Sequence, residues 1–181
     1  MVRRFPSNIQ ICQYILNKLG NKHTKIKEEK NSNTSLYLIA NDTISIANIK
    51  DTYTRVQTIA HECIHSMQNK KMLWFNFIYS NIFIISYLVI AILTMCGVIK
   101  NGMLWVSILL IMTIVFYFIR SYLEIDAMIK AKYLAKEYMQ ENKLTSQGNI
   151  EIIIKEYDKI NDLGIKTTCF MLLSKELVKI I

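Results

Sequence analysis

The chain has 181 residues, of which 52% are hydrophobic, and it carries a formal net charge of +8. The hydrophobic residues concentrate between Met72 and Ile119, which excludes a single soluble domain that uses all of them in its own core. No nucleic-acid-binding motif accompanies the positive charge, and anionic lipid headgroups are a sufficient partner for it. The four cysteines show no C-x-x-C spacing, which favours reduced thiols over a disulfide framework.

The first part of the chain has the pattern of a small layer of helix and strands. Residues 7–19 place apolar side chains at helical spacing, and residues 24–28 alternate like a short strand. Asn41-Asp42 is a turn signal, and after it Ile44 and Ile46 share one face of an extended segment. We therefore expect one short helix followed by two or three strands of a small sheet.

The next expected helix contains the most specific motif of the sequence, H-E-C-I-H at residues 61–65. Because a helix has about 3.6 residues per turn, His61 and His65 lie on one face and both imidazoles can reach one metal ion. Glu62 lies about 100° round the helix, off the ligand line but near a water at that ion. We expect this helix to run toward Lys71 and to begin at one of two candidate caps, Thr52 or Thr54.

Two long apolar segments follow the motif. Residues 72–99 run 28 positions without a charge and, after a short polar break, residues 103–119 run another 17. About 20 apolar residues span the hydrocarbon core of a bilayer, so the first segment is long enough, and tilt or local thinning would accommodate the second. The pattern predicts a transmembrane hairpin of two helices.

Lysine and arginine predict the orientation of this hairpin. Eleven of them precede Met72, one lies in the turn, and ten lie at or after Arg120. By the positive-inside rule, both termini and the motif are expected on the cytoplasmic side, with the turn outside. The chain is thus predicted to be an integral membrane protein whose partners include the lipid bilayer.

Three helices are expected after the hairpin. Residues 121–143 contain neither glycine nor proline and are strongly helical in pattern. Residues 150–161 and 165–181 are expected to form two amphipathic helices separated by Gly164. Charged residues in the last segment argue against a third span, and both an interfacial position and packing on the domain remain open.

A catalytic zinc site needs a third protein ligand besides two histidines. If the motif helix and the second span both continue straight past the membrane edge, His65 lies about 10 Å below it and Glu124 about 7–8 Å below it. Glu124 is therefore the expected third ligand, whereas His23 lies in a lysine-rich loop and Asp126 points elsewhere on its helix. Two histidines can also be hydrogen-bonded core groups, but a carboxylate at matching depth favours a metal site.

At these residues the sequence resembles a known family. HECIHSMQ, followed by two apolar segments and then YLEIDAMIKAKYLA, is similar to the YugP-type neutral zinc metallopeptidases, which are bacterial membrane proteins. That family has an H-E-x-G-H-A-x-Q helix and a later E-F-[DN]-A-S-type helix that supplies the third ligand. The resemblance covers roughly residues 7–140. It implies that one Zn²⁺ is bound by His61, His65 and Glu124 and that Glu62 is catalytic; Gln68 also matches the pattern.

The chain departs from this pattern at several positions. Ile64, Ser66 and Met128 stand where the family has Gly, Ala and Ser, and the usual N-terminal span and a clear C-terminal span are not found. A more distant resemblance is to the HtpX-type and CAAX-prenyl endopeptidases, which have an Asp four residues after the ligand Glu. That position is Met128 here, which favours the first family.

The resemblance implies a membrane-embedded zinc endopeptidase of the bacterial cell membrane. It would hydrolyse peptide bonds of peptides or proteins, membrane proteins among them, by a zinc-activated water with Glu62 as general base. In zincins the substrate extends along an edge strand beside the motif helix, and we expect residues 43–48 to form that strand. No nucleic-acid partner is expected.

A catalytically inactive alternative stays open. The chain could keep the metal site for structure, as a membrane scaffold or a partner subunit. A purely structural zinc site is normally closed by four ligands that often include cysteine. Cys63 lies inside the motif but faces away from His61, which argues against this alternative.

The expected fold class is a mainly α membrane protein with a small β-sheet and a zincin-like site beside a two-helix transmembrane hairpin. Residues 1–71 would form the N-terminal part of the catalytic domain and residues 72–119 the hairpin. Residues 120–143 would form the ligand-bearing helix and residues 144–181 the C-terminal amphipathic helices.

Overall fold

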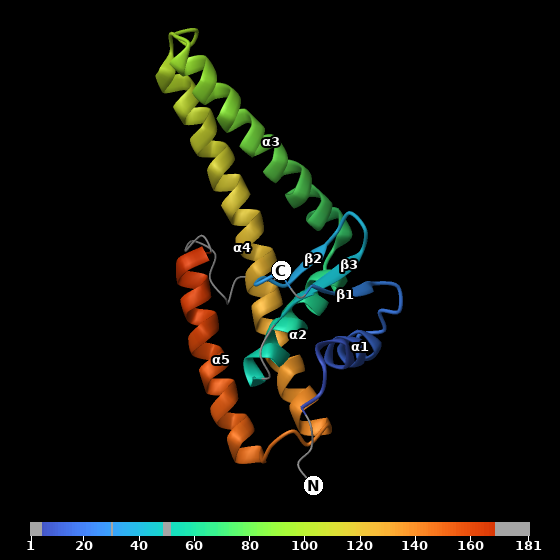
Figure 1. Ribbon diagram of the computed structural model, residues 1–181. Coiled ribbons are helices and arrows are strands. Elements are labelled where there is room, and N and C mark those ends of the chain that lie inside the picture. The colour runs from blue at the N-terminus through green and yellow to red at the C-terminus, as the bar shows by residue number, and fades with distance from the viewer. Residues whose placement is uncertain (1–4, 30, 49–51, 169–181) are drawn as a thin grey trace.

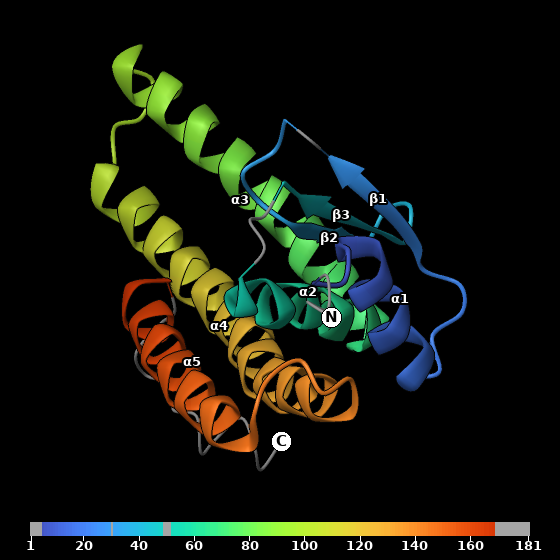
Figure 2. The same ribbon diagram turned by 60° about the horizontal axis from the view of Figure 1, so that its bottom comes forward.

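The computed structural model describes residues 5–29, 31–48 and 52–168 (Figure 1). It is mainly helical, with one sheet of three strands and two helices that are long and apolar enough to cross a membrane. Figure 2 shows α2 (Tyr53–Met67) between the layer of sheet and first helix on one side and α4 (Gly102–Glu141) on the other. The last helix, α5 (Gln147–Thr168), covers the outer side of α4.

The first helix, α1 (Asn8–Lys18), begins at a capping box. The Ser7 side chain accepts a hydrogen bond from the Gln10 backbone N–H, and the Gln10 side chain accepts one from the Ser7 backbone N–H. This exchange satisfies two backbone donors that the first turn would otherwise leave free. The apolar face of α1 is buried against α2 and the sheet; its members are Ile11, Cys12, Ile15 and Leu16, whereas Ile9, which the helical spacing also placed on this face, is exposed.

The sheet has the strand order β1-β3-β2. Strand β1 (Lys25–Glu29) pairs parallel to β3 (Thr43–Ala47), and β2 (Leu36–Leu38) pairs antiparallel to it. Every residue of β3 is buried, and a neighbouring strand pairs with it on each side. The expectation that residues 43–48 form a substrate-binding edge strand is therefore wrong, since β3 is the central strand.

The motif helix α2 does not run on toward Lys71. It ends at Met67, and Gln68 has an extended backbone with φ −65° and ψ 164°. A second helix, α3 (Lys70–Met95), starts after Asn69, whose side chain accepts a hydrogen bond from the Lys71 backbone N–H. The structure places Thr52 at the N-cap of α2, although its side chain makes no capping hydrogen bond. The estimate that His65 lies about 10 Å below the membrane edge assumed a straight helix from the motif into the first span. Because the helix is broken, that estimate does not hold.

Helices α3 and α4 form the predicted hairpin and project together from the rest of the molecule (Figure 1). In each helix, the most apolar stretch of 18 residues contains no buried residue. A soluble protein would expose this surface to water at a large cost, whereas a bilayer covers it. Gly97 ends the first helix at φ +69°, a left-handed conformation that glycine adopts without strain.

The second span and the ligand-bearing segment are one continuous helix. α4 runs 40 residues from Gly102 to Glu141, as the depth argument for Glu124 required. Below the apolar part, the small residues Ala127, Ala131 and Ala135 are fully buried, which lets neighbouring helices approach α4 closely.

The expected break at Gly164 is absent. α5 continues through this residue to Thr168, so residues 150–161 and the start of the second expected segment form one helix. A Cβ at Gly164 would lie 3.2 Å from Cε of Met128 on α4, so this glycine serves close helix packing. The remainder of the predicted C-terminal helix, residues 169–181, lies outside the described residues.

Candidate metal centre

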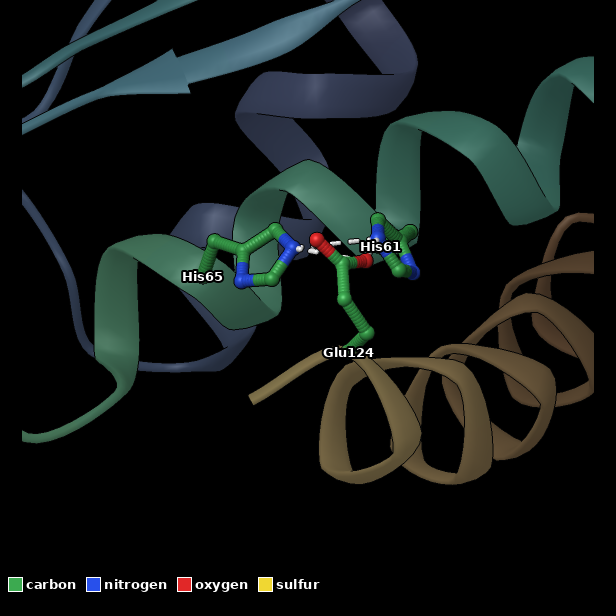
Figure 3. Close-up of side chains that lie close together, drawn as sticks. All are labelled: His61, His65 and Glu124. Atoms are coloured by element: carbon green, nitrogen blue, oxygen red, sulfur yellow. Dashed lines mark hydrogen bonds and ion pairs between the residues drawn. The ribbon is translucent and has the colours of Figure 1, made fainter. Parts of the chain in front are cut away.

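Three potential metal ligands from two helices meet at one point (Figure 3). His61 and His65 come from α2 and Glu124 from α4, and their ligand atoms all lie within 4.8 Å of one another. The two histidine Nε2 atoms are 3.0 Å apart. Oε2 of Glu124 lies 3.2 Å from Nε2 of His61 and 3.7 Å from Nε2 of His65. The proximity expected for residues 59 positions apart in sequence is thus present in the fold.

These distances are short enough for one metal ion to bind all three side chains. In a tetrahedral site with ligand bonds of about 2.05 Å, ligand atoms lie about 3.3 Å apart. The three observed separations of 3.0, 3.2 and 3.7 Å bracket that value. Two imidazole nitrogens and one carboxylate oxygen are also a donor set that catalytic zinc sites use, with a fourth position left for water.

A single side chain, Gln68, orients His65 and joins it to α4. Oε1 of Gln68 lies 2.8 Å from Nδ1 of His65, so an N–H at Nδ1 donates to it and Nε2 is left to face Glu124. Nε2 of Gln68 donates to the Leu123 carbonyl at 2.8 Å and to Oδ2 of Asp126 at 2.9 Å. Gln68 therefore couples the ligand ring on α2 to the turn of α4 that carries Glu124.

Asp126 lies behind the centre and does not face its ligands. Its Oδ2 accepts from Gln68, and its Oδ1 pairs with Lys130 at 2.6 Å. The sequence predicted that Asp126 points away from the ligands, but it did not predict the Gln68 bridge. The available signal was that Gln68 lies three residues after His65, one helical turn away. His23, the rejected ligand candidate, is exposed.

Glu62 is buried, with 7% of its surface exposed. Burial raises the pKa of its carboxyl group, since the charged form is desolvated. The charges of His61 and His65 and a backbone hydrogen bond from Tyr37 act in the opposite direction but do not cancel this effect. A carboxylate with a raised pKa is a stronger base than a solvated one.

The two facing ligands polarise each other. Burial alone would raise the pKa of Glu124, but hydrogen bonds and charge from His61 and His65 outweigh it and hold that pKa well below its usual range. Burial alone would lower the pKa of His65, but the Glu124 carboxylate outweighs it and raises that pKa above 6.5. Glu124 is therefore a permanent anion here, which favours a cation between the three side chains.

The centre opens into a cavity of about 430 Å³. One wall is formed by residues 34–37 and 39 in and around β2, and another by the roots of the two apolar helices. The lining residues of α3 and α4, other than the ligand, are Leu73, Asn76, Phe77, Ser80, Phe116, Arg120 and Leu123. The cavity thus lies between the three potential ligands, the sheet edge and the two long apolar helices.

Comparison of the chain with protein-family models, with curated proteins and with solved structures found no match.

Proposed function

We propose that this protein is a membrane-embedded zinc-dependent endopeptidase, similar to the YugP-type family. The observation that carries the proposal is the convergence of His61, His65 and Glu124 at ligand-to-ligand distances of 3.0–3.7 Å, with Glu62 beside them. Three protein ligands of this type, with no fourth in the described residues, are typical of a catalytic rather than a closed structural site.

The chemistry would be hydrolysis of a peptide bond by water. A zinc ion at this centre would acidify that water and polarise the scissile carbonyl. Glu62 takes the proton from the water and passes it to the leaving amine, a role for which its burial and raised pKa prepare it. Gln68 holds the His65 ring in the required tautomer, and Asp126 holds Gln68.

Strand β2, in place of the excluded β3, is the proposed docking edge for substrate. It is an outer strand of the sheet, and it lines the cavity beside the motif. Tyr37 is the middle residue of this strand and pairs with Ile44 of β3. A substrate in extended form can add to this edge as a further strand, and the backbone of Tyr37 already reaches Glu62.

The tyrosine side chain of this strand is held in place. The Tyr37 hydroxyl donates to Oδ1 of Asp42 at 2.7 Å and accepts from the ammonium group of Lys70. Lys70 also pairs with Asp42 at 3.1 Å. This network ties the docking edge to the first turn of α3, so the edge and the membrane helix keep a fixed relation.

The proposed location is the cytoplasmic face of a bacterial cell membrane. Two residues separate the end of α2 from the start of α3, and Glu124 lies five residues beyond Ile119 on α4. The metal centre therefore lies about one to two helical turns, or about 5–10 Å, from the apolar parts of both helices. The lysine and arginine distribution supports the cytoplasmic side.

Zinc content and peptidase activity of the wild type and Glu62→Gln test this proposal. The wild type should contain one zinc ion and cleave peptides, whereas Glu62→Gln should keep the zinc and lose at least about 100-fold in rate. Glu151→Gln, the same change at an exposed position of α5, is the matched control. Zinc in the wild type without cleavage of any peptide would instead favour the inactive metal-binding scaffold.

A further inference from the structure

The membrane-side wall of the cavity carries a cation that the proposed hydrolysis does not use. Arg120 lines the cavity together with the metal ligands. It precedes Glu124 by four residues on α4, so it lies on the same helix face, about 6 Å closer to the membrane. A substrate that leaves the metal centre toward the membrane would meet this side chain first.

Arg120 has no acidic partner within the described part of the chain. Its guanidinium lies 6.0 Å from the ring centroid of Phe116, and no carboxylate there pairs with it. The two acidic groups of the cavity wall are already engaged, since Glu124 faces the histidines and Glu62 accepts from the Tyr37 backbone. Among the described residues, Arg120 is therefore an exposed cation on the cavity rim without an acidic partner.

The wall beyond Arg120 is apolar, with one unsatisfied acceptor. Phe116 lies one turn farther along α4, and Leu73 and Phe77 face the cavity from α3. Asn76 also lines this region, although its Oδ1 is inaccessible to solvent and has no hydrogen-bond partner among the described residues.

We propose that this part of the cavity binds a peptide segment that bears a carboxylate, with the carboxylate on Arg120 and apolar residues between α3 and α4. The inference rests on the proposed peptidase function and names its substrate class. At about 3.3 Å per residue in an extended chain, a 6 Å separation places the carboxylate about two residues from the scissile bond. Its source is an Asp or Glu side chain or a C-terminal carboxylate.

An arginine at a membrane boundary often binds lipid phosphate instead. The position of Arg120 argues for substrate, because it lines the same cavity as His61, His65 and Glu124. A lipid headgroup seated there would occupy the route from the membrane side to the centre. Arginine is also the side chain that binds carboxylates in bidentate geometry.

Four versions of one cleaved peptide test the proposal. The parent peptide comes from a library of peptides with an apolar end, digested by the wild type in nanodiscs and identified by mass spectrometry. The versions carry Glu or Gln two residues from the scissile bond, each with a C-terminal acid or amide. For one of the two carboxylate positions, the wild type should cleave the peptide with the carboxylate about tenfold better in kcat/KM than its neutral counterpart, mainly through a lower KM.

Arg120→Gln should reduce this preference to less than about twofold with zinc content unchanged. Arg120→Lys should keep part of it, because the charge remains and the bidentate geometry is lost. Lys71→Gln removes an exposed cation at the root of α3, outside the cavity lining, and should leave the preference intact. The zinc-loaded Glu62→Gln protein provides a binding readout with the same four peptides that needs no turnover.

Three results would overturn the carboxylate site while leaving the peptidase in place. The first is equal cleavage of all four peptides by the wild type, and the second is a carboxylate preference that persists in Arg120→Gln. The third is an Arg120→Gln protein that differs from the wild type only in how its activity depends on anionic lipid. The last result would assign Arg120 to lipid headgroups. Failure of the wild type to cleave any library peptide, by contrast, would refute the proposed function itself.

Discussion

Replacing Gln68 with alanine removes the side chain that joins His65 to α4. The backbone of Gln68 should stay in place, because its N–H donates to the Ile64 and His65 carbonyls at 3.1 and 3.3 Å and the substitution keeps both bonds. What disappears is the acceptor for Nδ1 of His65 and the donor to Leu123 and Asp126. The perturbation is therefore confined to the orientation of one ligand and its link to the other helix.

The expected cost follows from these contacts. Loss of a group that orients a ligand histidine weakens metal binding by about 10- to 100-fold, which is about 1.4–2.8 kcal/mol. Asp126→Ala should cost less than about 10-fold, because Gln68 then keeps its bonds to His65 and to the Leu123 carbonyl. If Asp126 acts only through Gln68, the double variant should bind zinc no more weakly than Gln68→Ala alone.

The assay is zinc titration of the purified protein in competition with a chelating dye, for the wild type, both single variants and the double variant. Gln13→Ala, at an exposed position of α1, controls for the loss of a glutamine side chain. Unchanged zinc affinity in Gln68→Ala would refute the claim that Gln68 orients His65. Fully additive losses in the double variant would show that Asp126 acts by another route.

Three further predictions concern geometry, protonation and topology. Two alanines inserted between Ile119 and Arg120 would rotate the two parts of α4 relative to each other by about 200° and shift them apart by about 3 Å. Zinc binding and proteolysis should then fail, although the protein should still insert into the membrane. Four inserted alanines should restore most of the rotation and only part of the activity. Since zinc binding needs a neutral His65 and Glu124 raises the pKa of that ring, zinc affinity should fall as the pH is lowered, with an onset above that of an ordinary histidine; an onset no higher than that of an ordinary histidine would contradict the coupling. A reporter at residues 101–102 should be outside and reporters at both termini inside, and a cytoplasmic turn would reverse the proposed orientation.

The sequence predicted the parts of the fold that follow from local pattern. The uncharged runs predicted two helices long enough to cross a membrane, and α3 and α4 have that form. The turn at Asn41-Asp42 is present, with Asp42 at φ +48°, and separates β2 from β3 where one or two strands were expected. The helical rise along α4 predicted the level of Glu124, because that helix is continuous from the apolar segment to the site.

The errors arose where tertiary contacts decide the structure. Nothing local marks the end of α2 at Met67, since Gln68 leaves the helix while its side chain bridges His65 and α4. The central place of β3 depends on its pairing with β1 on one side and β2 on the other. Gly164 has the appearance of a helix stop in the sequence, but its contact with Met128 makes it a packing residue.

The most direct test of the account is the zinc content and peptidase activity of Glu124→Ala beside the wild type. Glu124 is the one proposed ligand that lies outside the H-E-x-x-H motif, and its place in the centre depends on the fold. Glu137→Ala, on an exposed part of the same helix, is the control. We predict one zinc ion per wild-type and control chain, and loss of both zinc and activity in Glu124→Ala. Stoichiometric zinc with wild-type activity in Glu124→Ala would contradict the proposed site.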